Sequence, residues 1–92
     1  MASSLQKSIL ITNKLGLHAR AATKLAQLSQ KFNAKVTIEL DDKKADASSI
    51  MGLMLLAGGQ GKTVTIHTQG EEAQQALDNV CQLFCDKFDE GE

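Results

Sequence analysis

The segment GLHAR, Gly16 to Arg20, places a histidine and an arginine two residues apart, just before a stretch with helical spacing. Glycine permits a sharp turn, so His18 is predicted to lie near the helix N-cap, beside backbone N–H groups that attract anions. The helix dipole and Arg20 both disfavour a protonated imidazole. A neutral imidazole is a nucleophile that can accept a phosphoryl group, whose charge these groups can stabilise. The five residues are also typical of an exposed histidine with no role.

Other chemistries have less support in the sequence. The segment GGQGKT, Gly58 to Thr63, lacks the first glycine of a Walker-type phosphate loop, so we expect a turn that enters a strand. Cys81 and Cys85 lie four residues apart among apolar neighbours, which is typical of buried thiols rather than a disulfide framework. No further ligand has suitable spacing for a metal site. We therefore expect no metal, no cofactor and no self-contained kinase.

Length and composition limit the classes of protein that the chain can represent. Its 92 residues suit one small domain, 1–92, with residues 1–4 and 89–92 predicted to fray. A net charge of -1 and only three aromatic residues, all phenylalanine, argue against nucleic-acid binding. No apolar segment approaches the ~20 residues of a membrane span, and no signal peptide is recognisable. We therefore expect a cytoplasmic protein without membrane insertion.

The elements that must position His18 follow from hydrophobic periodicity. Four segments have the residue pattern of strands, namely residues 8–12, 35–40, 44–47 and 62–68. Three segments have helical spacing, after GLHAR, after the serines at 48–49, and from the glutamates at 71–72, which would complement the dipole of the last helix in its first turn. The order β-α-β-β-α-β-α predicts an α+β fold, a two-layer open-faced sandwich. Its four-stranded antiparallel sheet is covered by three helices on one face.

The second helix is predicted to carry a surface for partners. Its inner face is expected to consist of Ile50, Leu53, Met54 and Ala57. Gly58 and Gly59 are expected to end the helix. Met51 and Leu55 fall outside this stripe and should face solvent, with Ile50 at the edge and Leu17 nearby, in an apolar docking patch. Core packing is the alternative for each residue singly. A monomer is expected, because transient docking must leave this face free.

Three other charged or titratable side chains are assigned to the surface. His67 falls on the polar face of the strand at 62–68 and is expected to be solvated. Lys24 and Lys31 lie on the outer side of the first helix, as solvated lysines or as charges that steer an acidic partner.

Three separated segments resemble one family in their order and spacing. They are GLHAR, ASSIMGLMLLA and GKTVTIHTQGEEAQQAL. From about Leu5 to Phe88 the sequence resembles the histidine-containing phosphocarrier (HPr) family of the bacterial phosphoenolpyruvate-dependent phosphotransferase system. The resemblance implies that His18 is phosphorylated at Nδ1 and that Arg20 assists. The family usually has proline where this chain has Ala21, so we expect a slightly looser helix start with intact chemistry.

The resemblance also implies partners and a second modification. Phosphorylated enzyme I would be the donor, and IIA proteins or domains the acceptors, in sugar uptake or in a nitrogen-related regulatory branch. Ser49 matches the serine that HPr kinase/phosphorylase modifies in some bacteria, although a helix N-cap explains it equally well. The segments ITNKLGLHAR and LFCDKFDEGE look like the nitrogen type and SSIMGLM like the sugar type, so the sequence only slightly favours the nitrogen type or a mixed regulatory use. The alternative function is a regulatory binding module that uses the same surface without transfer, and His18 beside Arg20 favours the carrier.

Overall fold

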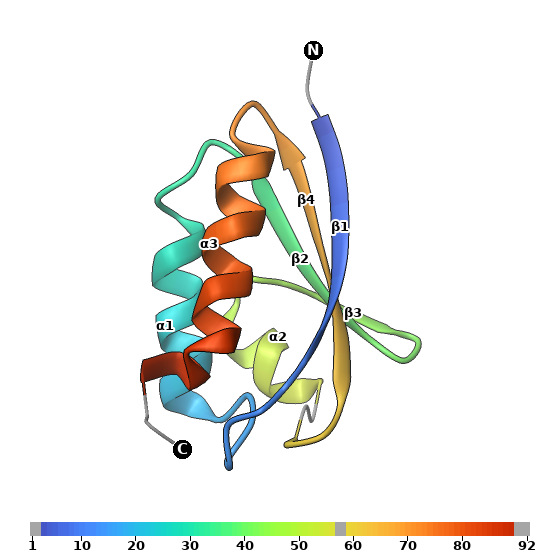
Figure 1. Cartoon of the computed structure of the whole chain (residues 1–92), viewed down its shortest axis with the longest axis vertical. Helices are drawn as coiled ribbons and strands as arrows, with labels where there is room; N and C mark the ends of the chain where they lie inside the picture. Colours follow the sequence, from blue (N-terminus) through green and yellow to red (C-terminus); the bar gives the residue numbers. More distant parts are fainter. Residues whose placement is uncertain (1–2, 57–58, 90–92) are drawn as a thin grey trace.

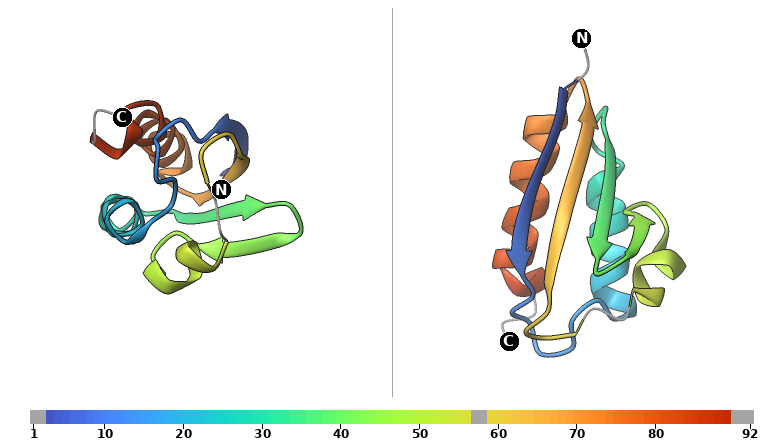
Figure 2. Two further views of the ribbon diagram at one scale, coloured as in Figure 1. Left: turned by 90° about the horizontal axis from the view of Figure 1, so that it is seen from below. Right: turned by 90° about the vertical axis from the view of Figure 1, so that its right-hand side faces the viewer.

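The computed structural model describes residues 3–56 and 59–89. Over these residues the chain forms four strands, three α-helices and one 3-10 turn, in the predicted order. They are β1 (Ser3–Leu10), α1 (Ala19–Ser29), β2 (Lys35–Leu40), β3 (Lys43–Asp46), α2 (Ile50–Leu55), β4 (Thr63–Gly70), α3 (Ala73–Cys85) and η1 (Lys87–Asp89). The strands form one antiparallel sheet in the order β1-β4-β2-β3. The helices lie on one face of it (Figures 1 and 2), so the predicted two-layer α+β sandwich is confirmed.

The core lies between the inner face of the sheet and the buried sides of the helices. In β2 the predicted alternation is complete, since Val36, Ile38 and Leu40 are buried while Thr37 and Glu39 are partly exposed. Each buried aliphatic side chain contributes about 1.5–3 kcal/mol to folding through loss of apolar surface to water. Within the part of the chain that the structure describes, this core contains no methionine.

The first strand is longer at its start and shorter at its end than predicted. It pairs with β4 from Ser3 opposite Gly70 to Leu10 opposite Thr63, so Ser3 and Ser4, which were expected to fray, belong to the sheet. Ile11 has left the strand. The early part of β1 was missed because Lys7 stands between the two residues that pack on the core, Leu5 and Ile9.

The inner face predicted for the second helix is largely wrong. Only Leu53 of α2 is buried, whereas Met54 is 45% exposed and Ile50 is 38% exposed. The reason is geometric, because this six-residue helix packs on the edge strand β3 and on α1 rather than across the sheet. A Cβ on Gly52 would lie 3.4 Å from Cβ of Ala45, so the approach to β3 is close. The expected inner residue Ala57 and terminator Gly58 lie outside the described residues.

The two glutamates before α3 do not lie in its first turn. The helix begins at Ala73, and both carboxylates bind Asn33 in the loop that follows α1. Glu72 Oε1 accepts a hydrogen bond from the Asn33 backbone N–H at 2.6 Å, and Glu71 Oε2 accepts one from Asn33 Nδ2 at 3.2 Å. Gly70 lies beside this junction with φ 136°, and a Cβ there would come within 2.8 Å of the Asn33 carbonyl oxygen. The two loops at this end therefore hold each other in place.

The described chain ends in a left-handed turn that is anchored to two helices. Lys87, Phe88 and Asp89 have φ values of 55°, 55° and 62°. Phe88 is fully buried, and its ring centroid lies 4.8 Å from that of Phe84 in an edge-on arrangement. Lys24 Nζ donates a hydrogen bond to the Phe88 carbonyl oxygen at 2.6 Å. Lys24 is therefore a structural anchor, and the prediction that it is a solvated or steering lysine is wrong.

The cysteine prediction holds for only one of the two thiols. Both cysteines are free, but Cys81 is buried on the inner side of α3 whereas Cys85 is exposed near its end. Burial raises the pKa of the Cys81 thiol, an effect that the positive charge of Lys7 partly offsets. Only Cys81 is therefore a core residue.

Candidate functional site

The loop between β1 and α1 determines how His18 is presented. Gly16 has φ 61°, so the predicted tight turn is present, and glycine is the residue that adopts this conformation at least cost. The Gly16 backbone N–H donates to the Asn13 carbonyl oxygen at 3.3 Å. Asn13 Nδ2 donates in return to the Gly16 carbonyl oxygen at 2.9 Å, and Asn13 is fully buried. The buried side chain of Asn13 thus stabilises the turn at Gly16, two residues before His18.

A second loop holds this one from the side. The Ile11 backbone N–H donates to the Lys62 carbonyl oxygen at 2.9 Å, and the Gly61 N–H donates to the Ile11 carbonyl oxygen at 2.9 Å. Gln60 Nε2 adds a bond to the Thr12 carbonyl oxygen at 3.1 Å. The segment at 59–62 is therefore the turn into β4 that the sequence predicted. Through these hydrogen bonds it fixes the position of the loop before His18 relative to the end of the sheet.

His18 is the N-cap residue of α1, as predicted. Its backbone is extended, with φ −75° and ψ 178°, and its carbonyl oxygen accepts the first helical hydrogen bond from the Ala22 N–H at 2.8 Å. The N–H groups of a helix's first turn have no partner within the helix, so they face the region that an N-cap side chain occupies. The imidazole is half-buried. This position suits a side chain that must meet a partner and then receive a dianionic group.

Arg20 lies in the first turn of α1 and is exposed. The helix buries Ala21 and Ala22 against the core, so its first turn is held while Arg20 remains at the surface. Ala21 occupies the position after the arginine and fits the core without a pyrrolidine ring. The structure thus places both members of the predicted pair at one end of one helix.

An exposed apolar surface lies on α2, which packs against α1. Met51 is 76% exposed and Leu55 is 74% exposed, and with the partly exposed Ile50 and Met54 they form a group that we call the α2 patch. Figure 1 and the right-hand view of Figure 2 show α2 at the same end of the molecule as the loop that leads into α1. Apolar side chains gathered in this way are typical of a partner surface.

Leu17 does not belong to this surface. It is only 4% exposed and packs in the core, so the prediction that it contributes to an exposed patch is wrong. Its neighbour in the loop, Leu15, is 66% exposed and was missed. A loop has no periodicity from which the inward and outward residues can be read, although an apolar residue between Lys14 and Gly16 was a visible signal.

The segment before α2 shows which serine caps the helix. Ser49 is the N-cap, and its Oγ accepts a hydrogen bond from the Gly52 N–H at 3.0 Å. Ser48 instead donates from both its backbone N–H and its hydroxyl to Asp46 Oδ1, at 2.8 and 2.7 Å. These two bonds lower the pKa of the Asp46 carboxyl. Both serines are exposed, and only Ser49 contacts the helix backbone through its side chain.

Comparison with known proteins identifies the family. The family model of the PTS HPr component phosphorylation site matches residues 5–86. The chain belongs to the HPr family. A phosphocarrier protein NPr of Shewanella violacea is 51% identical over 88 residues, covering 96% of this chain and 97% of that protein. A phosphocarrier protein HPr of Cupriavidus necator is 48% identical over 88 residues and covers 96% and 99%.

A solved HPr structure shares the fold. HPr-C-His from Thermoanaerobacter tengcongensis superposes with a TM-score of 0.89 at 38% identity, covering 94% of this chain and 97% of the other. The resemblance drawn from the sequence is thus confirmed, and the protein is a phosphocarrier of the HPr type in the phosphotransferase system. These relatives do not favour the alternative of a binding module that transfers nothing.

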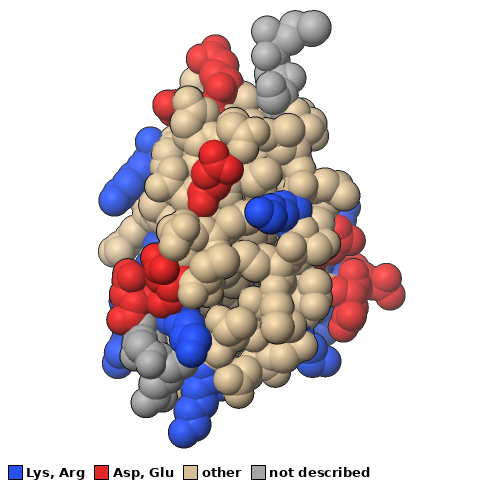
Figure 3. Space-filling model, viewed as in Figure 1, with Lys and Arg blue, Asp and Glu red and all other residues tan. Residues whose placement is uncertain are grey.

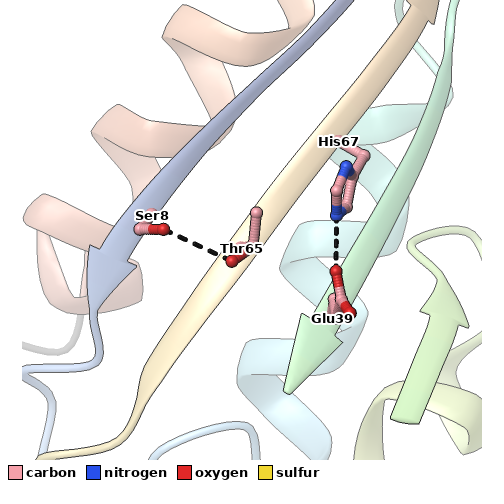
Figure 4. Close-up of polar contacts among 4 residues, drawn as sticks. All are labelled: Ser8, Glu39, Thr65 and His67. Atoms are coloured by element: carbon pink, nitrogen blue, oxygen red, sulfur yellow. Dashed lines mark hydrogen bonds and ion pairs between the residues drawn. The ribbon is translucent and has the colours of Figure 1, made fainter. Parts of the chain in front are cut away.

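The second histidine of this HPr protein lies on the uncovered face of the sheet. His67 Nε2 and Glu39 Oε1 are 2.7 Å apart, beside a contact of 3.3 Å between the hydroxyls of Ser8 and Thr65 (Figure 4). His67 lies on the polar face of its strand, as predicted, with 31% of its side chain exposed, but its contact with Glu39 was missed. A shallow, mostly polar depression of about 480 Å³ adjoins it and includes Lys35. His67 takes no part in the site at the start of α1.

The described residues of this HPr protein form neither a metal-ligand cluster nor a membrane-spanning helix. In residues 3–56 and 59–89, no three His, Cys, Asp or Glu side chains come together as metal ligands would. None of the helices in that part of the chain is long and apolar enough to cross a membrane. Acidic and basic side chains are interspersed over the face seen in Figure 3, in keeping with a net charge of -1. The site at the start of α1 remains the best-supported chemical centre.

Proposed function

We propose that this HPr protein accepts a phosphoryl group at Nδ1 of His18 from phosphorylated enzyme I and passes it to a IIA protein or domain. The observation that carries the proposal is the N-cap position of a half-buried histidine, with Arg20 in the same helical turn. As the new bond forms between phosphorus and Nδ1, the bond between phosphorus and the donor breaks, and the donor keeps that electron pair. The transfer to the acceptor repeats this exchange.

The surroundings of His18 stabilise the transferred charge. A phosphoryl group brings about two negative charges at neutral pH. The positive end of α1, its backbone N–H groups and the guanidinium of Arg20 can receive them, and charge stabilisation with correct positioning is what phosphoryl transfer chiefly requires. The chain would turn over only with its partners, as a carrier without a cofactor. We infer that it acts in the cytoplasm, as a monomer built from the single domain 1–92.

The α2 patch is the docking surface in this proposal. Its members are Ile50, Met51 and Leu55, which are exposed, and Met54, which we add because it is also exposed. The buried Leu17 would support the neighbouring loop from the core side. Met51→Asp should weaken transfer from enzyme I with little change in thermal stability. A large loss of stability would instead place Met51 among the core residues.

Ser49 is proposed as a regulatory site for HPr kinase/phosphorylase. Its hydroxyl is exposed and directly precedes Ile50, so a phosphate there would add charge beside the α2 patch and weaken docking. The sugar and nitrogen branches are supported almost equally, by 48% identity to a protein named HPr and 51% identity to one named NPr.

Phosphorus NMR with phosphoenolpyruvate and the enzyme I of the same organism tests the carrier role. Wild type should give an acid-labile phosphohistidine signal that His18→Ala lacks. His67→Ala is the matched control, because it removes the other histidine and should keep the signal. Arg20→Ala should slow the transfer. If wild type gives no signal with an enzyme I that phosphorylates another carrier, the regulatory binding module becomes the better account.

A further inference from the structure

The two methionines of α2 are placed unusually. Met51 and Met54 lie one helical turn apart and are both exposed, while the core of the described residues is built without methionine. Methionine is among the residues most often found inside proteins. An exposed pair therefore indicates a surface that a partner covers, and the flexible thioether is well suited to fit partners of different shape.

We propose that Met51 and Met54 are a reversible oxidation site that controls docking, an inference that rests on the docking role proposed above. Hydrogen peroxide transfers one oxygen atom to the thioether sulfur, which loses two electrons, and the peroxide leaves as water. A thiol-dependent reductase reverses the step, since two thiols become a disulfide and the oxygen leaves as water. Both sulfurs belong to exposed side chains, so the oxidant can reach them without unfolding the protein.

The consequence follows from the polarity of the product. A sulfoxide is polar and hydrogen-bonds to water, and a partner that covers the α2 patch must strip that water away. Docking should weaken about tenfold or more, the factor expected when one polar group is desolvated without a new partner. The folded state itself should be unaffected, because neither side chain is part of the buried core. The chemistry at His18 should also be unchanged once a donor is bound.

Oxidation of the cysteines must be distinguished from oxidation of the two methionines. Cys85 is exposed and can itself be oxidised, whereas Cys81 is buried and burial raises its thiol pKa, which disfavours the reactive thiolate. Cys85→Ser is therefore the background for every measurement. Met1 remains in all variants, so oxidation at the N-terminus is the same throughout.

The experiment compares Cys85→Ser with a variant that also carries Met51→Leu and Met54→Leu. Each protein is treated with dilute hydrogen peroxide, which is removed before enzyme I and phosphoenolpyruvate are added. Peptide mass mapping should find one added oxygen on Met51 and one on Met54. The KM of enzyme I for the treated carrier should rise about tenfold with kcat retained, and methionine sulfoxide reductase should restore it. In the leucine variant the KM should be the same before and after peroxide.

The outcomes separate the two proposals. If both methionines are oxidised and the KM does not change, the oxidation site is refuted while the carrier role stands. The same holds if peroxide raises the KM equally in the leucine variant, or if the two methionines resist oxidation. An untreated protein that takes no phosphate from enzyme I would overturn the carrier role and the oxidation site together.

Discussion

The left-handed turn at the end of the described chain stores strain that a single substitution can release. All three residues of this turn, Lys87, Phe88 and Asp89, have positive φ although none is glycine. This conformation costs about 1–2 kcal/mol per residue, so the turn holds about 3–6 kcal/mol of strain. Three interactions oppose it, namely the burial of Phe88, the edge contact of its ring with Phe84, and the hydrogen bond from Lys24 Nζ.

The free energy of the backbone strain and that of the three interactions that oppose it are nearly equal. Burial of a phenylalanine ring contributes about 1.5–3 kcal/mol, an aromatic contact about 0.5–1.5, and a hydrogen bond from an ammonium group about 1.5–3. Phe88→Ala removes the first two, so the strain is no longer compensated and residues 87–89 should leave the left-handed conformation. Because that strain is released, the free energy of unfolding should fall by only about 1–2 kcal/mol.

Phe84→Ala is the matched control. Phe84 is also fully buried, but it lies in the last turn of α3, which the Asp86 N–H closes with a 2.8 Å hydrogen bond to the Gln82 carbonyl oxygen, so its backbone should stay in place. The substitution therefore leaves a cavity and should cost about 3–5 kcal/mol, the range for phenylalanine in a core. The same chemical change should thus differ by about 1–4 kcal/mol between positions four residues apart.

Urea unfolding followed by circular dichroism gives both free energies from the midpoint and the m value. Hydrogen exchange adds a local readout, since the Asp89 N–H donates to the Asp86 carbonyl oxygen at 3.0 Å and should exchange much faster in Phe88→Ala. If Phe88→Ala costs as much as Phe84→Ala and the Asp89 amide stays protected, the turn is not strained in the way described.

Three further predictions concern single features of the fold. Gly70→Ala should cost about 3 kcal/mol in urea unfolding because its Cβ would meet backbone at 2.8 Å, whereas Gly61→Ala has open space and pays only the strain of positive φ, about 1–2 kcal/mol; equal losses would contradict this. The folded-state pKa of Asp46 is lowered from 3.8, so its stabilisation is present above the unfolded pKa and is lost as pH falls through the folded value. Asp46→Asn should therefore flatten the decline of melting temperature below about pH 4, and an unchanged slope would argue against it. Iodoacetamide should label exposed Cys85 and spare buried Cys81 in the folded protein, as judged by peptide masses, and labelling of both thiols at one rate would mean that α3 opens.

The parts of the fold that were predictable are those where local pattern and tertiary environment agree. The strand Lys35–Leu40 was predicted with its observed bounds, because it is central in the sheet and every second residue faces the helices. The same rule failed for β1, an edge strand where Lys7 can stand on the inner face and still reach solvent. Periodicity failed again for Met54. The spacing of apolar residues shows which side of a helix is apolar, but not how much of that side the rest of the protein covers when the helix is short.

The placement of His18 at the start of α1, with Arg20 in the first turn, was predictable from the segment GLHAR, since a glycine turn and a helix start are local properties. The supports of that site come from distant parts of the chain. Ile11 is held by Lys62, and the turn at Phe88 is held by Lys24. Neither pairing leaves a trace in the spacing of residues, because backbone carbonyl groups are the acceptors and every residue has one.

The position of β4 has a consequence for how the protein is made. The last strand along the chain lies between β1 and β2, so the first two-thirds of the sequence contain no adjacent pair of strands except the hairpin of β2 and β3. On the ribosome, residues 3–10 must wait for residues 63–70 before they gain a hydrogen-bonded neighbour, and such non-local pairing folds slowly. The loop before His18 waits for the same event, since it is bonded to Gly61 and Lys62. A nascent or truncated chain that stops before Gly70 would therefore have no completed sheet on which to set its histidine.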